Sequence, residues 1–398
     1  MRILYVSPYP PARDGIGAYT HVLAHAVRER GHDIAVVAAR PHPDAPDEVI
    51  GALGSTVKPL REAVDRFRPD VVHAQFAVPA FGARAPAVAR WLAAPGVPAV
   101  ATLHEVTRDT ALLRGPGRAL YRHLARGCDR LVVHTRAAGD TLRALGLDGR
   151  ATVVPHFSAP PPPATGTPAE LRKRFGLGDD RVLLAFGHVH VSKGLDDLVR
   201  AMTMLPPATL GEVRVVVAGA VRRRHGPFRV FEARDHLHEA AVRRLARRYG
   251  LRDRLLFTGY VPDGDVAAWF GAAEAVVLPY RDAEQSGVAN LARAFGVPVI
   301  ATAVGGLAEL FEGSPWAVPP GAPDRLASAI TDLLGTNPRA EAPTPARDTS
   351  LAALPPVQDT GLDTGLNTGL DTGLDAVTTR TIAVYESAHT AGNRPDAP

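Results

Sequence analysis

One segment of the sequence decides the fold class: AEAVVLPYRDAEQSGVANLARAFGVPVIATAVGGLAEL, residues Ala273–Leu310. It begins with an apolar run typical of a buried strand, continues through a polar loop into a helical stretch, and ends in a second apolar run. The helical spacing i, i+3, i+4, i+7 is carried by Val288, Leu291, Ala292 and Phe295. Ser286 is a suitable N-cap and Gly296 a suitable stop. Strand, helix and strand in this order predict a βαβ unit of a parallel sheet.

The same alternation fills two long stretches of the chain. The first contains the apolar runs RILYVS, DIAVVAA, DVVHAQF, PAVATLHE, RLVVHT and ATVVPHF. The second contains RVLLAFGHV, EVRVVVAGAV, RLLFTGYV, EAVVLPY and VPVIATAV. Continuous Val, Ile and Leu runs that alternate with helical segments indicate parallel sheets covered on both faces. We therefore expect an α/β protein of two doubly wound, Rossmann-like domains that face each other across a cleft.

Composition shifts mark the expected boundaries. The expected parts are an N-terminal domain (1–157), a Pro-rich linker (158–168), a second domain (169–334), a flexible tether (335–375) and a C-terminal helix (376–392). The tether contains DTGL repeats between Asp359 and Leu374, with Asn367 once in place of Asp. Such a repeat has too little apolar content for a core. The helix after it carries apolar residues that would dock on the N-terminal domain.

Bulk composition excludes several classes of protein. The 398 residues carry a formal net charge of only +4, which gives no case for a nucleic-acid partner. Cys128 is the sole cysteine, so intrachain disulfides and cysteine-based zinc sites are excluded and a reducing compartment is favoured. No apolar run approaches about 18 residues. We expect a cytoplasmic protein, and the basic run Val221–Gly226 could contact an anionic membrane surface or form an ordinary solvated face.

A glycine-rich loop, DGIGAY, follows the first apolar run. Gly15 and Gly17 leave room for close approach of a ligand, and the helix start beyond them would present unpaired N–H groups, which favour a phosphate. The loop could equally be a tight turn. It is neither G-x-G-x-x-G nor a P-loop, and no acidic residue ends DIAVVAA, so an NAD site is disfavoured.

Three further loops stand at predicted strand ends in the second domain. FGHVHVSKG places Gly187 and His188 after a strand and Lys193 before a helix, where an ammonium suits a phosphate contact, although a solvated lysine is the alternative. The helix beginning at Gly287 would offer the free N–H groups of Gly287, Val288 and Ala289, worth about 0.3–2 kcal/mol to an anion. VGGLAEL again places glycines at a strand end before a helix, and that helix carries Glu309. Together the loops predict a diphosphate site.

These motifs resemble the GT-B glycosyltransferases of the retaining, family-four kind. The resemblance runs in order to about Leu334 and resumes at the last helix. It is carried by RILYVSPYPPARDGIGAYTHVLAHAVRERGHDIAVVA, DVVHAQF, TLHE, ATVVPHF, GHVHVSKGLDDLVRAM, VVVAGA, LLFTGYV, VLPYRDAEQSGVANLARAFGVPVIATAVGGLAEL and TIAVYESA. One motif would be weak evidence, whereas the ordered set is specific.

The resemblance implies a function for the loops. A nucleoside diphosphate sugar would bind mainly to the second domain and the acceptor to the first, without a metal ion. Gly15 and Gly17 would approach the donor diphosphate, and His104 of TLHE would lie beside the transferring sugar. Lys193 would neutralise the leaving diphosphate, with backbone N–H groups donated from Gly287 and Val288. The last helix would brace the first domain.

Two departures from the family pattern concern the donor site. His188 stands where the family usually has Arg, and Leu291 stands at the second of the family's two Glu positions. Either a one-residue shift puts Glu284 in the role of the first Glu, or EQSG is a variant loop in which Gln285 or Ser286 does that work. In the variant loop Asn290 would contact the nucleoside and Glu284 would still face the cleft. We favour the variant loop.

The expected activity is retaining transfer of a hexose-type sugar from a UDP- or GDP-sugar to a hydroxyl of an unidentified acceptor: a glycan, a lipid-linked molecule or a small molecule. Apart from this co-substrate no cofactor is expected. Two alternatives stay open on the same fold: a sugar-nucleotide epimerase or phosphorylase-like enzyme, and a non-catalytic sugar-nucleotide-binding protein.

Overall fold

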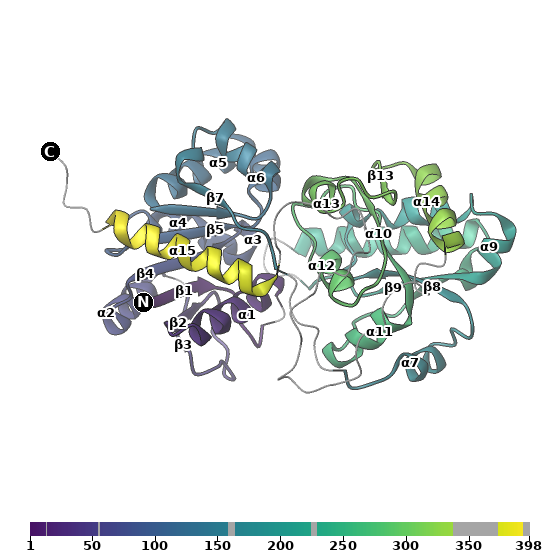
Figure 1. Cartoon of the computed structure of the whole chain (residues 1–398), viewed down its shortest axis with the longest axis horizontal. Coiled ribbons are helices and arrows are strands. Elements are labelled where there is room, and N and C mark those ends of the chain that lie inside the picture. The colour runs from purple at the N-terminus through teal and green to yellow at the C-terminus, as the bar shows by residue number, and fades with distance from the viewer. Residues whose placement is uncertain (13, 55, 158–163, 224–228, 337–372, 393–398) are drawn as a thin grey trace. The chain divides into compact units, whose positions relative to one another are not determined.

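The computed structural model describes residues 1–12, 14–54, 56–157, 164–223, 229–336 and 373–392 (Figure 1). The chain forms two compact units, Met1–Ala159 with Gly369–Pro398, and Pro160–Thr368. Most of the linker expected at 158–168 and most of the tether expected at 335–375 lie outside the described residues. None of the described helices is long and apolar enough to cross a membrane.

Unit 1 is built on a seven-stranded sheet with the order β3-β2-β1-β4-β5-β6-β7. Its pairings are parallel, and Leu4 of β1 lies between Ala35 of β2 and Val72 of β4. The strands are β1 (Arg2–Ser7), β2 (Asp33–Ala38), β3 (Val49–Ala52), β4 (Val71–Phe76), β5 (Ala99–Leu103), β6 (Arg130–Val133) and β7 (Ala151–Val153). The helices are α1 (Gly15–Glu29), α2 (Lys58–Phe67), α3 (Val78–Phe81), η1 (Gly82–Arg84), α4 (Ala85–Leu92), α5 (Val106–Gly127), α6 (Arg136–Ala144), η2 (Asp148–Arg150) and α15 (Leu374–Gly392).

Unit 2 carries a six-stranded parallel sheet with the order β10-β9-β8-β11-β12-β13. Its strands are β8 (Arg181–Phe186), β9 (Val213–Ala218), β10 (Leu255–Phe257), β11 (Ala273–Leu278), β12 (Val299–Thr302) and β13 (Ala317–Val318). Its helices are α7 (Pro168–Arg174), η3 (Val191–Lys193), α8 (Leu195–Met202), α9 (Pro207–Glu212), α10 (Arg229–Arg248), η5 (Arg252–Arg254), η6 (Asp263–Asp265), α11 (Val266–Ala272), α12 (Gly287–Ala294), α13 (Gly305–Leu310) and α14 (Pro323–Thr336). Two parallel α/β sheets confirm the predicted fold class.

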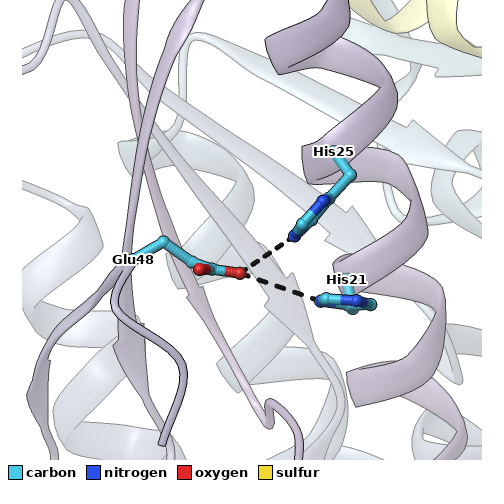
Figure 2. A group of neighbouring side chains, drawn as sticks. All are labelled: His21, His25 and Glu48. Carbon is cyan, nitrogen blue, oxygen red and sulfur yellow. Dashed lines mark hydrogen bonds and ion pairs between the residues drawn. The ribbon is translucent and has the colours of Figure 1, made fainter.

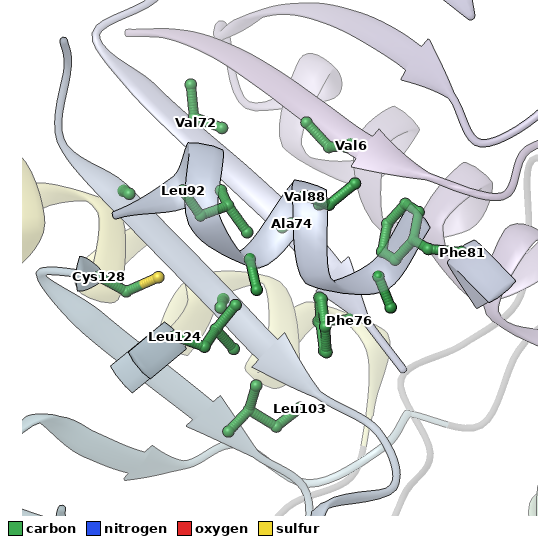
Figure 3. Close-up of a cluster of buried hydrophobic side chains, with 14 of the residues drawn as sticks. Val6, Val72, Ala74, Phe76, Phe81, Val88, Leu92, Leu103, Leu124 and Cys128 are labelled. Carbon is green, nitrogen blue, oxygen red and sulfur yellow. The ribbon is translucent and has the colours of Figure 1, made fainter. Parts of the chain in front are cut away.

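The apolar runs become strands because both faces of each sheet are buried. Leu4 and Val6 of β1 pack into one core, and Ile3 and Tyr5 pack into the other core on the opposite face. Figure 3 shows the first core, where β4 meets α4 and α5. Complete burial of a Leu or Val side chain contributes about 1.5–3 kcal/mol. Cys128 is buried in this core, and burial raises the pKa of its thiol to about 12.

The C-terminal helix α15 belongs to unit 1 although residues 160–368 separate it from the rest of that unit in the sequence. It contacts α1 and the strands β4, β5 and β6, and Figure 1 shows it in yellow across this unit. Val377, Val384 and Tyr385 are buried in the same core as Ile3 and Tyr5. The helix therefore supplies part of the cover of one sheet face.

Candidate functional site

Each sheet has a switch point, where the strand order reverses and a crevice opens at the carboxyl ends. In unit 1 the switch point lies between β1 and β4, and in unit 2 between β8 and β11. The glycine-rich loop (DGIGAY) follows β1, the lysine loop (GHVHVSKG, residues 187–194) follows β8, and the EQSG loop (residues 284–287) follows β11. The residues predicted from sequence therefore lie at the carboxyl edges of the two sheets.

The lysine loop of unit 2 is pressed against the end of β11. Gly194 has φ of +61°, and a Cβ there would lie 1.8 Å from the carbonyl oxygen of Pro279, so only glycine fits. The backbone N–H of Arg281 donates to the carbonyl of Ser192 over 2.7 Å. These contacts fix the position of Lys193, the residue between Ser192 and Gly194.

The Lys193 ammonium lies 3.6 Å from the centroid of the Tyr280 ring, a cation–π contact. Among the residues that the structure describes, no carboxylate lies within ion-pair distance of it. The nearest acidic residues in sequence are already paired, because Arg281 donates to Asp197 over 3.0 Å and to Asp196 over 2.7 Å. Burial alone would raise the pKa of Asp196, but Arg281 and Arg200 hold it below its usual value. The described carboxylates thus leave the charge of Lys193 without an ion-pair partner.

The helix α12 begins as predicted, with Ser286 as its N-cap. The Ser286 hydroxyl accepts from the N–H of Ala289 over 3.2 Å. The expectation of a free N–H group at Ala289 was therefore wrong, because this N–H group already donates to the N-cap side chain of the helix. Among the described residues, the N–H groups of Gly287 and Val288 meet no protein acceptor. Two donors remain at this helix start.

Three loops of unit 2 touch one another at this edge. A Cβ on Gly187 would lie 3.4 Å from the Val288 side chain, and one on Gly305 would lie 1.9 Å from the carbonyl oxygen of Ala283. A hollow at the edge is lined by Gly187, His188, Lys193, Leu195, Pro279 and Tyr280, among others. The structure thus brings together the three loops of unit 2 that the sequence predicts for a diphosphate.

The remaining predicted residues of unit 2 stand around this edge. His188 is exposed, with its Nδ1 3.3 Å from the carbonyl oxygen of Ala220. Glu284 and Gln285 are partly buried, and one side-chain oxygen of each is shielded from solvent. Asn290 is buried, and Glu309 on α13 is partly buried.

The glycine-rich loop of unit 1 differs from the expectation. Asp14 caps α1, and its Oδ1 accepts from the N–H groups of Ile16 (2.9 Å) and Gly17 (3.2 Å). The expectation that this helix start presents unpaired N–H groups was wrong at these two positions, because a carboxylate of the chain itself takes them. A Cβ on Gly17 would lie 3.2 Å from Pro8, which explains this glycine by packing. Gly15 is exposed and has open space where a Cβ would lie.

His104 follows β5 and is almost fully buried. Its Nε2 lies 2.7 Å from Oε1 of Gln75, and because that oxygen can only accept, Nε2 carries the proton. Burial, reinforced by the neighbouring histidines His134, His156 and His73, lowers the pKa of His104 well below its usual value. The imidazole is therefore neutral near pH 7, with a fixed tautomer.

A buried relay extends from Gln75 to the C-terminal helix. The Gln75 amide donates to Nε2 of His73 over 3.3 Å, and the hydroxyl of Thr102 donates to the same nitrogen over 2.7 Å. The proton of His73 then resides on Nδ1, which donates to the Tyr385 hydroxyl over 2.7 Å. The Tyr385 hydroxyl also shares a hydrogen bond of 3.0 Å with the Tyr5 hydroxyl. The orientation of His104 is thus linked through side chains to α15.

Sequence reasoning missed two histidines beside His104. His134 follows β6 and His156 follows β7, and the rings of all three histidines lie 4.6–5.5 Å from the Tyr19 ring, centroid to centroid. Burial lowers the pKa of His134 to about 3 and that of His156 to about 4. Nδ1 of His134 donates to the carbonyl of Val154 over 2.8 Å, and its buried Nε2 has no partner among the described residues. The available signal was a histidine within three residues after each of three strands.

Comparison with known families gives two matches along the chain. A model described as Glycosyltransferase Family 4 matches residues 13–157. A model described as Glycosyl transferases group 1 matches residues 180–336. The two matches cover the unit 2 sheet and, apart from β1, the unit 1 sheet.

Characterised relatives point in the same direction. The D-inositol 3-phosphate glycosyltransferase of Xylanimonas cellulosilytica is 37% identical over 55% of this chain and 54% of its own length. The GDP-mannose-dependent alpha-(1-6)-phosphatidylinositol monomannoside mannosyltransferase of Mycobacterium tuberculosis is 29% identical over 85% of this chain and 90% of its own length. The chain therefore matches about half the length of the first relative and most of the second.

Solved structures share the fold. Sucrose-phosphate synthase from Thermosynechococcus elongatus superposes with a TM-score of 0.69 at 18% identity, covering 98% of this chain and 100% of its own. HepE from Anabaena, solved in complex with UDP, superposes with a TM-score of 0.66 at 16% identity, covering 98% and 99%. At such identities the likeness concerns the fold alone.

Proposed function

Because this chain belongs to the group 1, family 4 glycosyltransferases of the GT-B fold, we propose that it transfers a hexosyl unit from a nucleoside diphosphate sugar to an acceptor hydroxyl, with retention of configuration. The observation that carries the donor half of this proposal is the edge of unit 2. There, within the part of the chain that the structure describes, a lysine without a carboxylate partner, two unpaired backbone N–H groups and an exposed imidazole stand on loops that touch one another. A diphosphate is an anion of matching size and charge.

The proposed chemistry stabilises a leaving group. As the bond between the sugar and the diphosphate breaks, negative charge grows on the departing oxygen. Lys193 would offset that charge, and the Gly287 and Val288 N–H groups would donate hydrogen bonds to the phosphate oxygens. Such donors are held in place before the reaction, and each is worth about 10²–10³ in kcat in comparable sites. This arrangement supports a mechanism in which protein groups do the work that a metal ion does elsewhere.

His104 would lie beside the transferring sugar. Because its Nε2 proton is committed to Gln75 and its ring is neutral, His104 would act beside the sugar as a neutral hydrogen-bonding group and not as a cation. Glu284, Gln285 and Ser286 would contact the sugar, and Gly15, Gly17 and Glu309 complete the proposed donor set.

For the acceptor we propose an inositol-bearing molecule. The two relatives described above act, by their names, on an inositol phosphate and on a phosphatidylinositol mannoside. A lipid acceptor would bring the protein to an anionic membrane surface as a peripheral protein. Part of the basic run expected to serve that contact, Val221–Gly226, lies outside the described residues.

The test is incubation of the full chain with UDP- and GDP-hexoses and with inositol, inositol phosphate or phosphatidylinositol vesicles. We expect one donor to yield free nucleoside diphosphate and a glycosylated acceptor, identified by mass spectrometry, with the anomeric configuration of the donor by NMR. Sugar isomerised without acceptor would indicate an epimerase, and sugar released as its phosphate would indicate a phosphorylase. Nucleotide binding without even slow donor hydrolysis would indicate a binding protein, and each of these three results overturns the proposal.

A further inference from the structure

A second cluster of polar side chains lies in unit 1, apart from the residues of the proposed transfer reaction. His21 and His25 stand four residues apart on α1, so both point from the same face of that helix, with ring centroids 4.2 Å apart. Glu48, which lies just before β3, reaches toward both (Figure 2). Three residues from two segments of the chain therefore converge on one point.

The distances within the cluster suit a small cation. Oε1 of Glu48 lies 3.0 Å from Nε2 of His25 and 3.8 Å from Nδ1 of His21, and the three ligand atoms all lie within 4.8 Å of one another. Tetrahedral Zn²⁺, with bonds of about 2.0–2.2 Å, holds its ligand atoms about 3.3 Å apart. Small side-chain movements would bring the three atoms to that spacing.

The donor set selects the class of cation. Two imidazoles and one carboxylate are a zinc-type set, and two histidines four residues apart on a helix are a recurrent way to build one. Among the residues that the structure describes, no other group of His, Cys, Asp and Glu side chains meets the same spacing. The cluster is therefore singled out by its geometry.

One neighbouring side chain would support cation binding at the cluster and another would oppose it. The Tyr9 hydroxyl donates to Oε1 of Glu48 over 2.9 Å and would orient that ligand. Arg28 donates to Nδ1 of His25 over 2.9 Å and brings a positive charge to the site. Both histidines are about one third exposed, which leaves an entry path for the ion.

We propose that His21, His25 and Glu48 form a binding site for a borderline divalent cation of the zinc class, with the fourth position open. The ion would join α1 to the segment before β3. It would stand outside the chemistry of sugar transfer, so the proposal does not depend on the function of the donor site.

The experiment is titration of the full chain, without an affinity tag and free of chelator, with Zn²⁺ by calorimetry and with Co²⁺ by visible absorption. We expect one equivalent of Zn²⁺ and a Co²⁺ absorption band typical of low coordination number. His21→Ala, His25→Ala and Glu48→Gln should each weaken Zn²⁺ binding at least about tenfold. His32→Ala and His42→Ala, which change other histidines of the same unit, should leave affinity within about twofold.

Arg28→Gln supplies a variant with the opposite expected sign. Removing the positive charge of the Arg28 guanidinium, together with its hydrogen bond to His25, should tighten Zn²⁺ binding several-fold. If Glu48→Gln and wild type, both folded by circular dichroism, bind Zn²⁺ equally, or if wild type binds no Zn²⁺ at all, the cluster is a hydrogen-bonded group only and the proposal fails.

Discussion

At the scale of single residues, the role open to a charged side chain depends on whether neighbouring side chains already form ion pairs with it. Asp196 and Asp197 stand close to Lys193 in sequence, yet Arg200 and Arg281 pair with both. The ammonium contacts an aromatic ring instead. This distribution of ion pairs, which the sequence does not reveal, is the strongest physical reason to assign Lys193 to an anionic ligand.

Lys193→Ala should therefore reduce kcat about 10²-fold or more, because the departing diphosphate would lose the ammonium that we propose offsets its charge. Lys193→Arg keeps a charge but changes its shape, and should recover part of the activity. Steady-state kinetics with the donor identified by the panel would measure both, alongside thermal unfolding to show intact folds. Activity of Lys193→Ala near that of wild type would remove this residue from the mechanism.

At the scale of elements, the decisive features are the loops after the strands and the helix that returns from the far end of the chain. Gly15 and Gly287 have open space where a Cβ would lie, whereas Gly194 has a backbone oxygen there. Glycine at the first two positions is thus not required by the protein's own packing, and glycine at the third is.

These glycines make a matched set of variants. Gly15→Ala and Gly287→Ala should fold normally, since each glycine stands at a helix start with room for a methyl group. If a diphosphate approaches the backbone there, each substitution should raise KM for the donor about tenfold. Gly194→Ala should be strongly destabilised, because both its positive φ and the Pro279 carbonyl exclude a Cβ. Donor kinetics and urea unfolding separate the two effects. An unchanged KM in Gly15→Ala would show that no diphosphate comes near Gly15.

The docking of α15 can be tested through its one buried hydroxyl pair. Tyr385→Phe leaves Nδ1–H of His73 without its acceptor and the Tyr5 hydroxyl without its hydrogen-bond partner, both in a fully buried place. We expect a loss of about 1–3 kcal/mol in the free energy of unfolding, measured by urea titration. The same change at the exposed Tyr249 should stay within about 0.5 kcal/mol. Equal stabilities of the two variants would mean that the relay does not stabilise the docked helix.

Sequence patterns predicted the inner strands of both sheets and one edge strand of each, β7 and β10, which lie in longer apolar runs, and failed at the other two edges. The long apolar runs are all strands, because a strand buried on both faces must be apolar along its length. β3 and β13 are edge strands of four and two residues, too short to form a pattern, and they were missed.

The candidate site divides in the same way. The cap at Ser286 and the loop at Gly194 are local and were predictable from nearby residues. The grouping of His104 with His134 and His156 depends on the order of strands in the sheet, as does the relay to Tyr385. Neither can be read from spacing along the chain.

At the scale of the whole molecule, the buried histidines predict how stability changes with pH. His73, His104, His134 and His156 all have pKa values lowered by burial, with values of about 3, 3 and 4 for His73, His134 and His156. In the unfolded chain these groups titrate near 6.5. Below that pH the unfolded state binds protons that the folded state does not bind. The free energy of unfolding should therefore fall as pH falls from about 6.5 toward 4.

Each such histidine contributes a slope of about 1.4 kcal/mol per pH unit in that window. Urea unfolding between pH 7.5 and 5 would measure it, and His134→Asn should reduce the slope by about the share of one histidine. His42→Ala, at an exposed histidine, should not change it. A slope that is the same in His134→Asn and wild type would contradict burial of a neutral ring at this position.

The most direct test of the central claim is a crystal structure of the full chain with whichever of UDP and GDP binds more tightly. The account predicts that the phosphate next to the departing sugar lies within hydrogen-bond distance, about 2.7–3.2 Å, of the Gly287 or Val288 backbone nitrogen and of the Lys193 ammonium. A diphosphate located elsewhere, or no binding of either nucleotide, would contradict it.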